Sequence, residues 1–270
     1  MAAGQRLLEL RAGHGSEPAT GKSDDLRKAG DLLAHEFLAA ELAARRPADA
    51  VLSEEGKDDA GRLSAERVWI VDPLDGTREF GELGRTDWAV HVALWERGDL
   101  TAGAVALPAR DLVLSTLNPP PPPPPPRPGH AGGEADLSGV RIVVSRSRPP
   151  EFVQRMAAAT GAELVPMGSA GAKAAMVVLG ECDAYVHAGG QYEWDSAAPV
   201  AVARAAGLHT SRIDGSALAY NQADVSIPDI LISPAWLAPR LLAEIARASA
   251  GGEPASAPAG PSSSDPEFSS

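Results

Sequence analysis

The stretch Val68-Trp69-Ile70-Val71-Asp72-Pro73-Leu74-Asp75-Gly76-Thr77 contains the feature that decides the fold. Its apolar start is typical of a buried strand, and the strand runs directly into two acids three positions apart. Asp-Pro and Asp-Gly are strong turn formers, so we expect the strand to end at Asp72. Both carboxylates then point to one place beyond the strand end, where oxygen ligands suit Mg²⁺. The alternative interpretation is that these residues form only a tight turn.

Two further stretches place acids at the ends of predicted elements. Glu54 and Glu55 follow a short apolar strand at 50–52, and Asp195 precedes a predicted helix at 196–206. Both have a plain alternative, since exposed glutamates are ordinary loop residues and an aspartate before a helix is a common N-cap. A carboxylate that caps a helix can also face a cation, so the two interpretations of Asp195 are compatible.

Two segments are suited to binding anions. Gly168-Ser169-Ala170-Gly171-Ala172-Lys173 opens a predicted helix, whose free N–H groups and positive dipole end favour a phosphate, and Lys173 adds a charge. Ser145-Arg146-Ser147-Arg148 follows a predicted strand, and arginine can bind a phosphate through two parallel hydrogen bonds. A serine-capped helix and a solvated loop are the alternative interpretations of these segments.

The rest of the pattern predicts helices and strands packed in layers. Apolar residues at helical spacing predict a long helix at about 26–46. Further strands are predicted at 88–96, 100–107, 112–116, 141–144, 163–165 and 184–187, and further helices at 151–159, 170–179 and 235–248. Strands and helices alternate in the second half, which favours α/β or α+β packing.

Composition divides the chain into four parts. The eight prolines Pro119–Pro126 predict an extended or disordered loop. We interpret it as a tolerated insertion, and a ligand for a proline-binding domain is the alternative. We therefore expect an α+β lobe with the metal-binding acids over 1–118 and a proline-rich linker over 119–136. An α/β lobe with substrate-binding segments is expected over 137–249, and a disordered tail over 250–270.

Charge and composition narrow the classes of partner. The 270 residues carry a formal net charge of -12, which repels nucleic-acid backbones but not a small anion at a site with bound cations. No apolar run approaches the roughly 18 residues of a membrane span, and none has signal-peptide length, so we expect no membrane partner. The single cysteine, Cys182, fits a reducing compartment, and we expect a cytoplasmic protein.

Together the motifs resemble the inositol monophosphatase superfamily of lithium-sensitive, magnesium-dependent phosphatases, and within it the actinobacterial CysQ-type 3′(2′),5′-bisphosphate nucleotidases. The resemblance extends from about Arg27 to Ser233. The matching segments are Leu52-Ser53-Glu54-Glu55, Asp72–Thr77, Val144–Arg148, Gly168–Lys173, Trp194–Pro199 and Tyr220-Asn221-Gln222. The resemblance implies a layered αβαβα sandwich that is often a homodimer.

The resemblance also implies a role for each motif. The expected metal ligands, for two or three Mg²⁺ ions, are Glu54, Asp72, Asp75, Asp195 and the backbone carbonyl of Leu74. The expected catalytic residues are Thr77, which orients the attacking water, its helical partner Asp31, and Glu55. The segment before Asp31, Leu26-Arg27-Lys28-Ala29-Gly30, departs from the family, which usually has a Thr shortly before the acid and a Lys before that.

The implied substrate is a small phosphate ester, in the first place 3′-phosphoadenosine 5′-phosphate. The expected substrate contacts are Glu54, Leu74, Asp75, Gly76, Thr77, Ser145, Arg146, Ser169, Lys173, Glu193, Trp194 and Asp195, with Tyr220 also near the sugar or base. Of these, Ser145-Arg146 and Ser169–Lys173 are expected to hold a second phosphate. Inositol phosphate and fructose 1,6-bisphosphate are alternative substrates, and a non-catalytic scaffold that recruits partners through its prolines is the alternative of another class.

Overall fold

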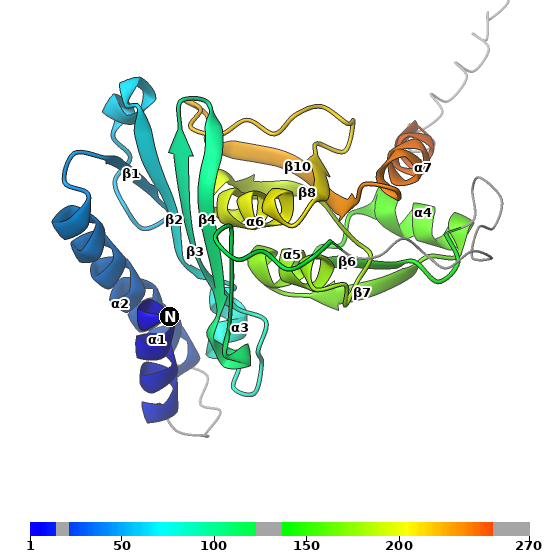
Figure 1. Ribbon diagram of the computed structural model, residues 1–270. Helices are drawn as coiled ribbons and strands as arrows, with labels where there is room; N and C mark the ends of the chain where they lie inside the picture. Colours follow the sequence, from blue (N-terminus) through cyan, green and yellow to red (C-terminus); the bar gives the residue numbers. More distant parts are fainter. Residues whose placement is uncertain (15–21, 123–136, 251–270) are drawn as a thin grey trace, which may run out of the picture.

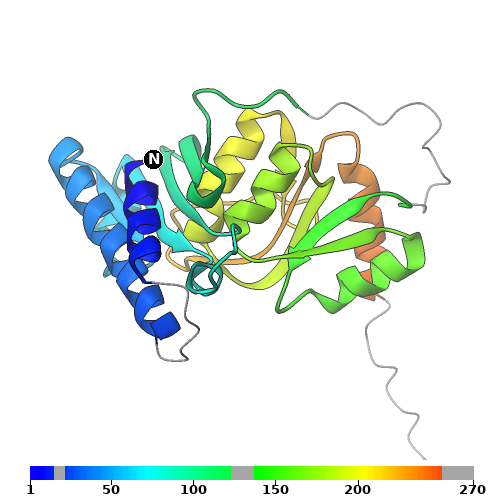
Figure 2. The same ribbon diagram turned by 90° about the horizontal axis from the view of Figure 1, so that it is seen from below.

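The computed structural model describes residues 1–14, 22–122 and 137–250. Three layers of helices alternate with two five-stranded sheets (Figures 1 and 2). This arrangement confirms the αβαβα sandwich that the resemblance implied. Residues 123–126 of the proline run, most of the predicted linker and nearly all of the predicted tail lie outside the described residues.

The first sheet brings two of the acid motifs to the same edge. Its strands, in spatial order, are β1 (Ala50–Ser53), β2 (Arg67–Asp75), β3 (Ala89–Glu96), β4 (Asp99–Leu107) and β5 (Leu112–Ser115). β1 runs parallel to β2, with Ser53 opposite Val71, and the other neighbours are antiparallel. Since the two strands run in the same direction, Glu54, directly after β1, lies beside the C-terminal part of β2 that contains Asp72.

Two helices, α1 (Ala2–Gly13) and α2 (Lys22–Arg45), cover the outer face of this sheet (Figure 1). The sequence predicts α2 but not α1, because the buried residues of α1, Ala3, Gly4 and Leu7, include only one large apolar side chain and make a weak pattern. The short helix α3 (Thr77–Gly81), also not predicted, continues from β2. It turns the chain away from the sheet directly after the acid motif.

Helices α5 (Ala170–Val178) and α6 (Glu193–Ala205) fill the layer between the two sheets and contact both (Figure 1). The largest core cluster therefore contains residues of the first sheet, such as Ile70, and of the second, such as Ile230. Alanines dominate the buried faces of both helices. Their small side chains let the sheets approach closely, which accounts for a core with few aromatic residues.

The second sheet has the order β7-β6-β8-β10-β9. Its strands are β6 (Arg141–Ser145), β7 (Glu163–Met167), β8 (Ala184–Tyr192), β9 (Leu208–Ser211) and β10 (Ser226–Pro234), and helices α4 (Glu151–Thr160) and α7 (Ala238–Ala250) cover its outer face. β9 and β10 are not among the predicted elements. Pro228 makes β10 look unlike a central strand, but it lies at a register shift between Ile227 and Asp229, where a proline is tolerated.

Several predicted boundaries are wrong. β2 does not end at Asp72 but continues to Asp75, and α6 begins at Glu193 instead of Ser196. β8 continues to Tyr192 instead of ending at position 187, α2 begins at Lys22, and the last helix begins at Ala238. Helix and strand ends depend on tertiary hydrogen bonds that a local pattern does not contain. Among the described helices, none is both long and apolar enough to cross a membrane.

Candidate active site

A bulge in β2 brings Asp72 and Asp75 to the same side of the strand. Residues three apart face opposite sides of a regular strand. Here Asp72 lies opposite His91 and Asp75 lies opposite Ala89, so β2 has one residue more than β3 between these two pairs. The hydrogen bond from the Leu74 N–H to Asp72 Oδ1, 3.0 Å, holds this irregular turn. The three-residue spacing therefore brings the carboxylates of Asp72 and Asp75 together because of a bulge within β2, and not because the strand ends at Asp72.

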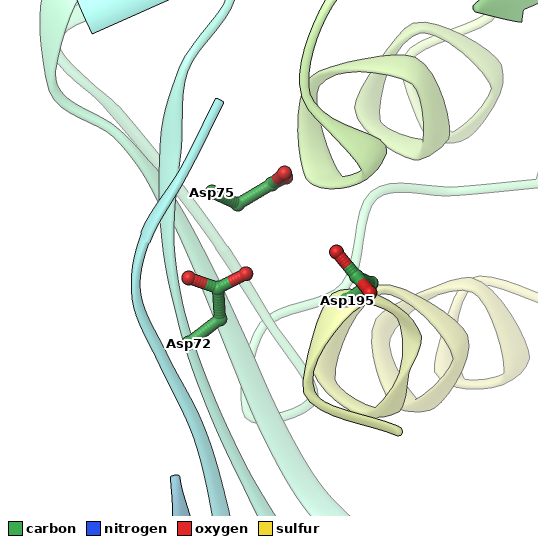
Figure 3. A group of neighbouring side chains, drawn as sticks. All are labelled: Asp72, Asp75 and Asp195. Carbon is green, nitrogen blue, oxygen red and sulfur yellow. The ribbon is translucent and has the colours of Figure 1, made fainter. Parts of the chain in front are cut away.

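Asp195 meets this pair from the inner helical layer. It is the third residue of α6. Its Oδ2 accepts a 2.6 Å hydrogen bond from the Tyr192 N–H, so it also caps the N-terminus of the helix. One carboxylate oxygen from each of Asp72, Asp75 and Asp195 lies within 4.8 Å of the others. Figure 3 shows Asp195 facing the two acids of β2. Acids from distant parts of the chain thus form one cluster.

The acids of the cluster destabilise one another's charged forms. Burial, followed by the charges of Asp75, Glu54 and Asp195, raises the pKa of Asp72 well above its usual value. Burial and the nearby Asp195 carboxylate raise the pKa of Glu54 to about 7, and burial with the Asp75 charge raises the pKa of Asp195 to about 6. Divalent cations would remove this repulsion, so the donor set fits the metal that the sequence predicts.

Asp75 is the exception, because the first turn of α5 binds its carboxylate. Its Oδ2 accepts hydrogen bonds from the Ser169 hydroxyl (2.5 Å) and the Gly171 N–H (2.7 Å), and its Oδ1 accepts one from the Ala170 N–H (3.0 Å). His91 Nε2 lies 3.2 Å from Oδ2. Burial acts to raise the pKa of Asp75, but His91 and these donors outweigh it, and the pKa falls below its usual value.

Thr77 and Asp31 form a hydrogen-bonded pair next to the cluster. The Thr77 hydroxyl is 3.1 Å from Asp31 Oδ1 and 2.9 Å from the Leu74 carbonyl. Gly30 permits this approach of α2, because a Cβ there would lie only 2.6 Å from the Phe80 ring. Burial raises the pKa of Asp31 to about 6, with a smaller contribution from the Glu55 charge. The structure thus brings Asp31 to Thr77 although the segment before Asp31 departs from the family pattern.

The model of the inositol monophosphatase family matches residues 2–250. The chain belongs to this family. A relative from Mycobacterium leprae, named 3′-phosphoadenosine 5′-phosphate phosphatase, is 49% identical over 254 residues, which cover 90% of this chain and 89% of the relative. A 3′(2′),5′-bisphosphate nucleotidase CysQ from Escherichia coli is 28% identical, over 81% of this chain and 89% of its own length.

Solved structures of the inositol monophosphatase family share the fold. Inositol monophosphatase II from Staphylococcus aureus matches with a TM-score of 0.72 over 90% of this chain and 91% of its own, at 20% identity. CysQ from Bacteroides thetaiotaomicron matches with a TM-score of 0.67 over 86% and 93%, at 27% identity. Because the staphylococcal structure is only 20% identical to this chain, its similarity is evidence for the fold alone.

Arg146, a predicted phosphate ligand of this family member, is paired with acids. Its guanidinium donates to Glu79 (2.6 Å) and Glu82 (2.9 Å), which belong to α3 and the residue after it. The Ser145 hydroxyl accepts the Arg148 N–H at 3.3 Å. A substrate phosphate would have to compete with two carboxylates for Arg146, so its predicted contact stays a prediction.

The predicted phosphate site at the start of α5 is corrected by the structure. Ser169 and the N–H groups of the first turn bind Asp75 in place of a substrate anion. Lys173 is only 5% exposed, and its Nζ donates to the carbonyls of Gly168 and Ser169. This helix start binds an anion, but the anion is a carboxylate of the protein itself and not the predicted substrate phosphate.

Two predicted substrate contacts near Asp195 are also corrected. The Glu193 side chain is fully buried, and its carboxylate accepts the N–H groups of Asn221 (2.6 Å) and Gln222 (2.7 Å). Tyr220 is 4% exposed, and its hydroxyl lies 3.1 Å from that of Ser196. Trp194, in contrast, is half-buried and stacks on the exposed Tyr192 ring at a centroid distance of 4.9 Å. It remains a candidate for contact with the base.

His91 supports the site from within the core. It is fully buried, with Nε2 beside Asp75 and Nδ1 3.1 Å from the Trp194 carbonyl at the start of α6. Burial acts against its charged form, yet the Asp75 carboxylate raises the pKa of His91. It therefore links two of the acid-bearing elements. No local spacing distinguishes it, because its partners come from other strands and helices.

Proposed function

We propose that this chain is a magnesium-dependent phosphatase that hydrolyses 3′-phosphoadenosine 5′-phosphate to AMP and phosphate. The observation that carries the proposal is the convergence of Asp72, Asp75 and Asp195 within 4.8 Å, beside the hydrogen-bonded Thr77 and Asp31. The names of the relatives that are about half identical over most of the chain support the substrate.

The acids would divide between two or three cations. In this proposal Glu54 and Asp72 hold one ion, and Asp72, Asp75 and Asp195 hold a second, with the Leu74 carbonyl as a further ligand. The Thr77 hydroxyl also lies 2.9 Å from the Leu74 carbonyl, but in this proposal its single proton is donated to Asp31, so the carbonyl lone pairs stay available to a cation. When bound, Mg²⁺ would neutralise phosphate charge and lower the pKa of a water molecule.

Thr77 and Asp31 are suited to orient the attacking water and to accept its proton. The Thr77 hydroxyl donates to Asp31, which leaves its oxygen lone pairs free to accept from a water. Asp31 is half-buried, and its pKa of about 6 places it near the operating pH of a general base. Glu55 lies close enough to influence Asp31 electrostatically, and we propose that it assists this proton transfer.

The remaining contacts concern the substrate. We propose that the N–H groups of Gly76 and Thr77 bind the transferred phosphate and that Trp194 borders the base. With Lys173 buried, Arg146 and Ser145 are the remaining members of the predicted site for the second phosphate. Arg146 would have to exchange Glu79 or Glu82 for that phosphate.

A phosphate-release assay tests the proposal on 3′-phosphoadenosine 5′-phosphate, inositol 1-phosphate and fructose 1,6-bisphosphate. We expect turnover that requires Mg²⁺, stops with a chelator and favours the nucleotide. A preference of roughly a hundredfold for inositol 1-phosphate would replace the substrate but keep the chemistry. Full activity in a strong chelator would overturn the metal assignment.

Quaternary structure and location belong to the same proposal. We propose a homodimer, as the family resemblance implies, which gel filtration with light scattering would measure. We also propose a cytoplasmic location, since the single, buried Cys182 suits a reducing compartment.

A further inference from the structure

Arg62 is a buried charge outside the acid cluster. It lies in the short 3₁₀ helix η1 (Ala60–Ser64), in the loop that connects Glu54 and Glu55 to β2. Its side chain is 1% exposed, although arginine is rarely buried without a specific partner. The loop is otherwise largely exposed to solvent. A guanidinium buried in such an exposed loop indicates that its hydrogen bonds hold the loop in a defined position.

The guanidinium connects its own loop to a segment 159 residues further along the chain. Nε and Nη2 bind both oxygens of Asp58, at 2.7 and 3.1 Å. Nη1 donates to Asn221 Oδ1 (2.8 Å) and Nη2 donates to the Gln222 carbonyl (2.9 Å). The Asn221 amide returns a hydrogen bond to the Arg62 carbonyl at 3.2 Å. The planar fork is therefore fixed on three sides.

The far side of this connection is the start of α6. Glu193, the first residue of α6, accepts the N–H groups of Asn221 and Gln222, and it lies two residues before Asp195. An unbroken series of hydrogen bonds therefore runs from the loop after Glu54, through Arg62 and the 221–222 segment, to the helix that carries Asp195. We call Asp58, Arg62, Asn221, Gln222 and Glu193 the Arg62 bridge.

We propose that Arg62 is a positioning residue, which holds the Glu54–Glu55 loop and the start of α6 at the separation that cation binding requires. The inference rests on the proposed function only in assuming that the acid cluster binds divalent cations. Glu54 follows a strand of the first sheet, whereas Asp195 belongs to the inner helices, and like charges drive the two apart. The Arg62 bridge opposes that separation without touching a cation or the substrate.

The experiment compares Arg62→Lys with Arg212→Lys in the full-length chain. Arg212 makes a bidentate pair with Asp229 on β10, with two contacts of 2.7 Å, so its replacement removes a similar interaction away from the acid cluster. Calorimetric titration with Mn²⁺ measures cation affinity directly, and the melting temperature reports stability. Mg²⁺ activation of phosphate release supplies the apparent activation constant.

We expect Arg62→Lys to weaken Mn²⁺ affinity about tenfold or more, as removal of supporting groups around metal ligands commonly does. At saturating Mg²⁺ the kcat of Arg62→Lys should be close to that of the unaltered chain, because excess cation compensates for the weaker affinity. Arg212→Lys should lower the melting temperature and leave the affinity unchanged. Equal affinities for Arg62→Lys and the unaltered chain would overturn the inference, as would an equal loss in Arg212→Lys.

Asp58→Asn provides the same test if Arg62→Lys does not fold. The Asp58 side chain is 47% exposed, so this variant keeps the buried guanidinium and removes only the charge that orients it. We expect a smaller loss of Mn²⁺ affinity in the same direction, and no loss would count against the inference. A chain that binds Mn²⁺ but releases no phosphate would overturn the proposed function and leave this test intact.

Discussion

Asp75 differs from the other acids of the cluster in the partners of its carboxylate. Asp72 and Asp195 have raised pKa values, whereas the pKa of Asp75 is lowered. The first turn of α5 and His91 compensate for the burial of its charge. Asp75 thus attaches the inner helical layer to the first sheet, in addition to its proposed role as a metal ligand.

Asp75→Asn should therefore lower both turnover and stability. An amide cannot accept from every donor that Asp75 binds, and one buried donor left without a partner costs about 1–3 kcal/mol. Phosphate release and thermal unfolding without metal measure the two effects.

Asp72→Asn is the matched control. It should also lose turnover, but its metal-free melting temperature should stay equal or rise, because it removes a charge that its neighbours repel. Equal melting temperatures for the two variants would contradict the distinction between Asp72 and Asp75.

At the scale of elements, the close contact of α2 with α3 decides where Asp31 lies. Gly30 faces the Phe80 ring and Leu74, so that a Cβ would come within 3 Å of both side chains. The sequence pattern predicts α2 and its apolar positions, but it contains no sign of this contact. The packing of α2 therefore brings Asp31 to Thr77 although the segment before it lacks the Thr and the Lys of the family pattern.

Gly30→Ala should push α2 away from Phe80 and separate Asp31 from Thr77. Overpacking of this kind typically costs about 1–3 kcal/mol, and the wider separation should lower kcat more than it changes KM. Gly13→Ala is the control, since nothing lies within 4 Å of a Cβ there. A Gly30→Ala variant with normal kcat would show that the contact does not position Asp31.

The same scale separates what the sequence could predict from what it could not. The acid motifs, the separate strands β1 and β2 and the inner helices follow from local patterns, whereas the parallel pairing of the two strands does not. The bulge between Asp72 and Asp75, the partners of Lys173 and those of Glu193 do not, because each depends on a contact across many residues of chain. Lys173 and Glu193 were both assigned to substrate, since a charged residue in a motif looks available until its partners are known.

For the whole molecule, the acid cluster makes metal-free stability depend on pH. Glu54, Asp195 and Asp31 have folded-state pKa values of about 7, 6 and 6, above those of the unfolded chain. The folded state then binds more protons than the unfolded state between about pH 4 and 7, so stability falls as pH rises through this window. The raised pKa of His91 acts in the same direction. Burial lowers the pKa of His187 to about 4, which acts in the opposite direction below the ordinary histidine pKa of about 6.5, but this one group is outweighed by the three acids and His91.

The metal-free melting temperature should accordingly be lower at pH 8 than at pH 6. Saturating Mg²⁺ should raise it more at pH 8, because cations then replace fewer protons, and each kcal/mol corresponds to roughly 2–4 °C for a chain of this size. Differential scanning calorimetry in buffers of equal ionic strength measures both effects. An equal Mg²⁺ shift at the two pH values would contradict proton–cation competition at the cluster.

The largest core cluster contains residues of both sheets, so it can form only after most of the chain has been synthesised. Asp75 leaves the ribosome well before Ser169, Ala170 and Gly171, which solvate its charge, and before Asp195, which completes the cluster. A nascent chain that ends at the proline run has the acids of β2 but neither of the inner helices that cover them. The proposed cation binding is therefore expected only late in biosynthesis. It should distinguish full-length chains from chains that end at the proline run.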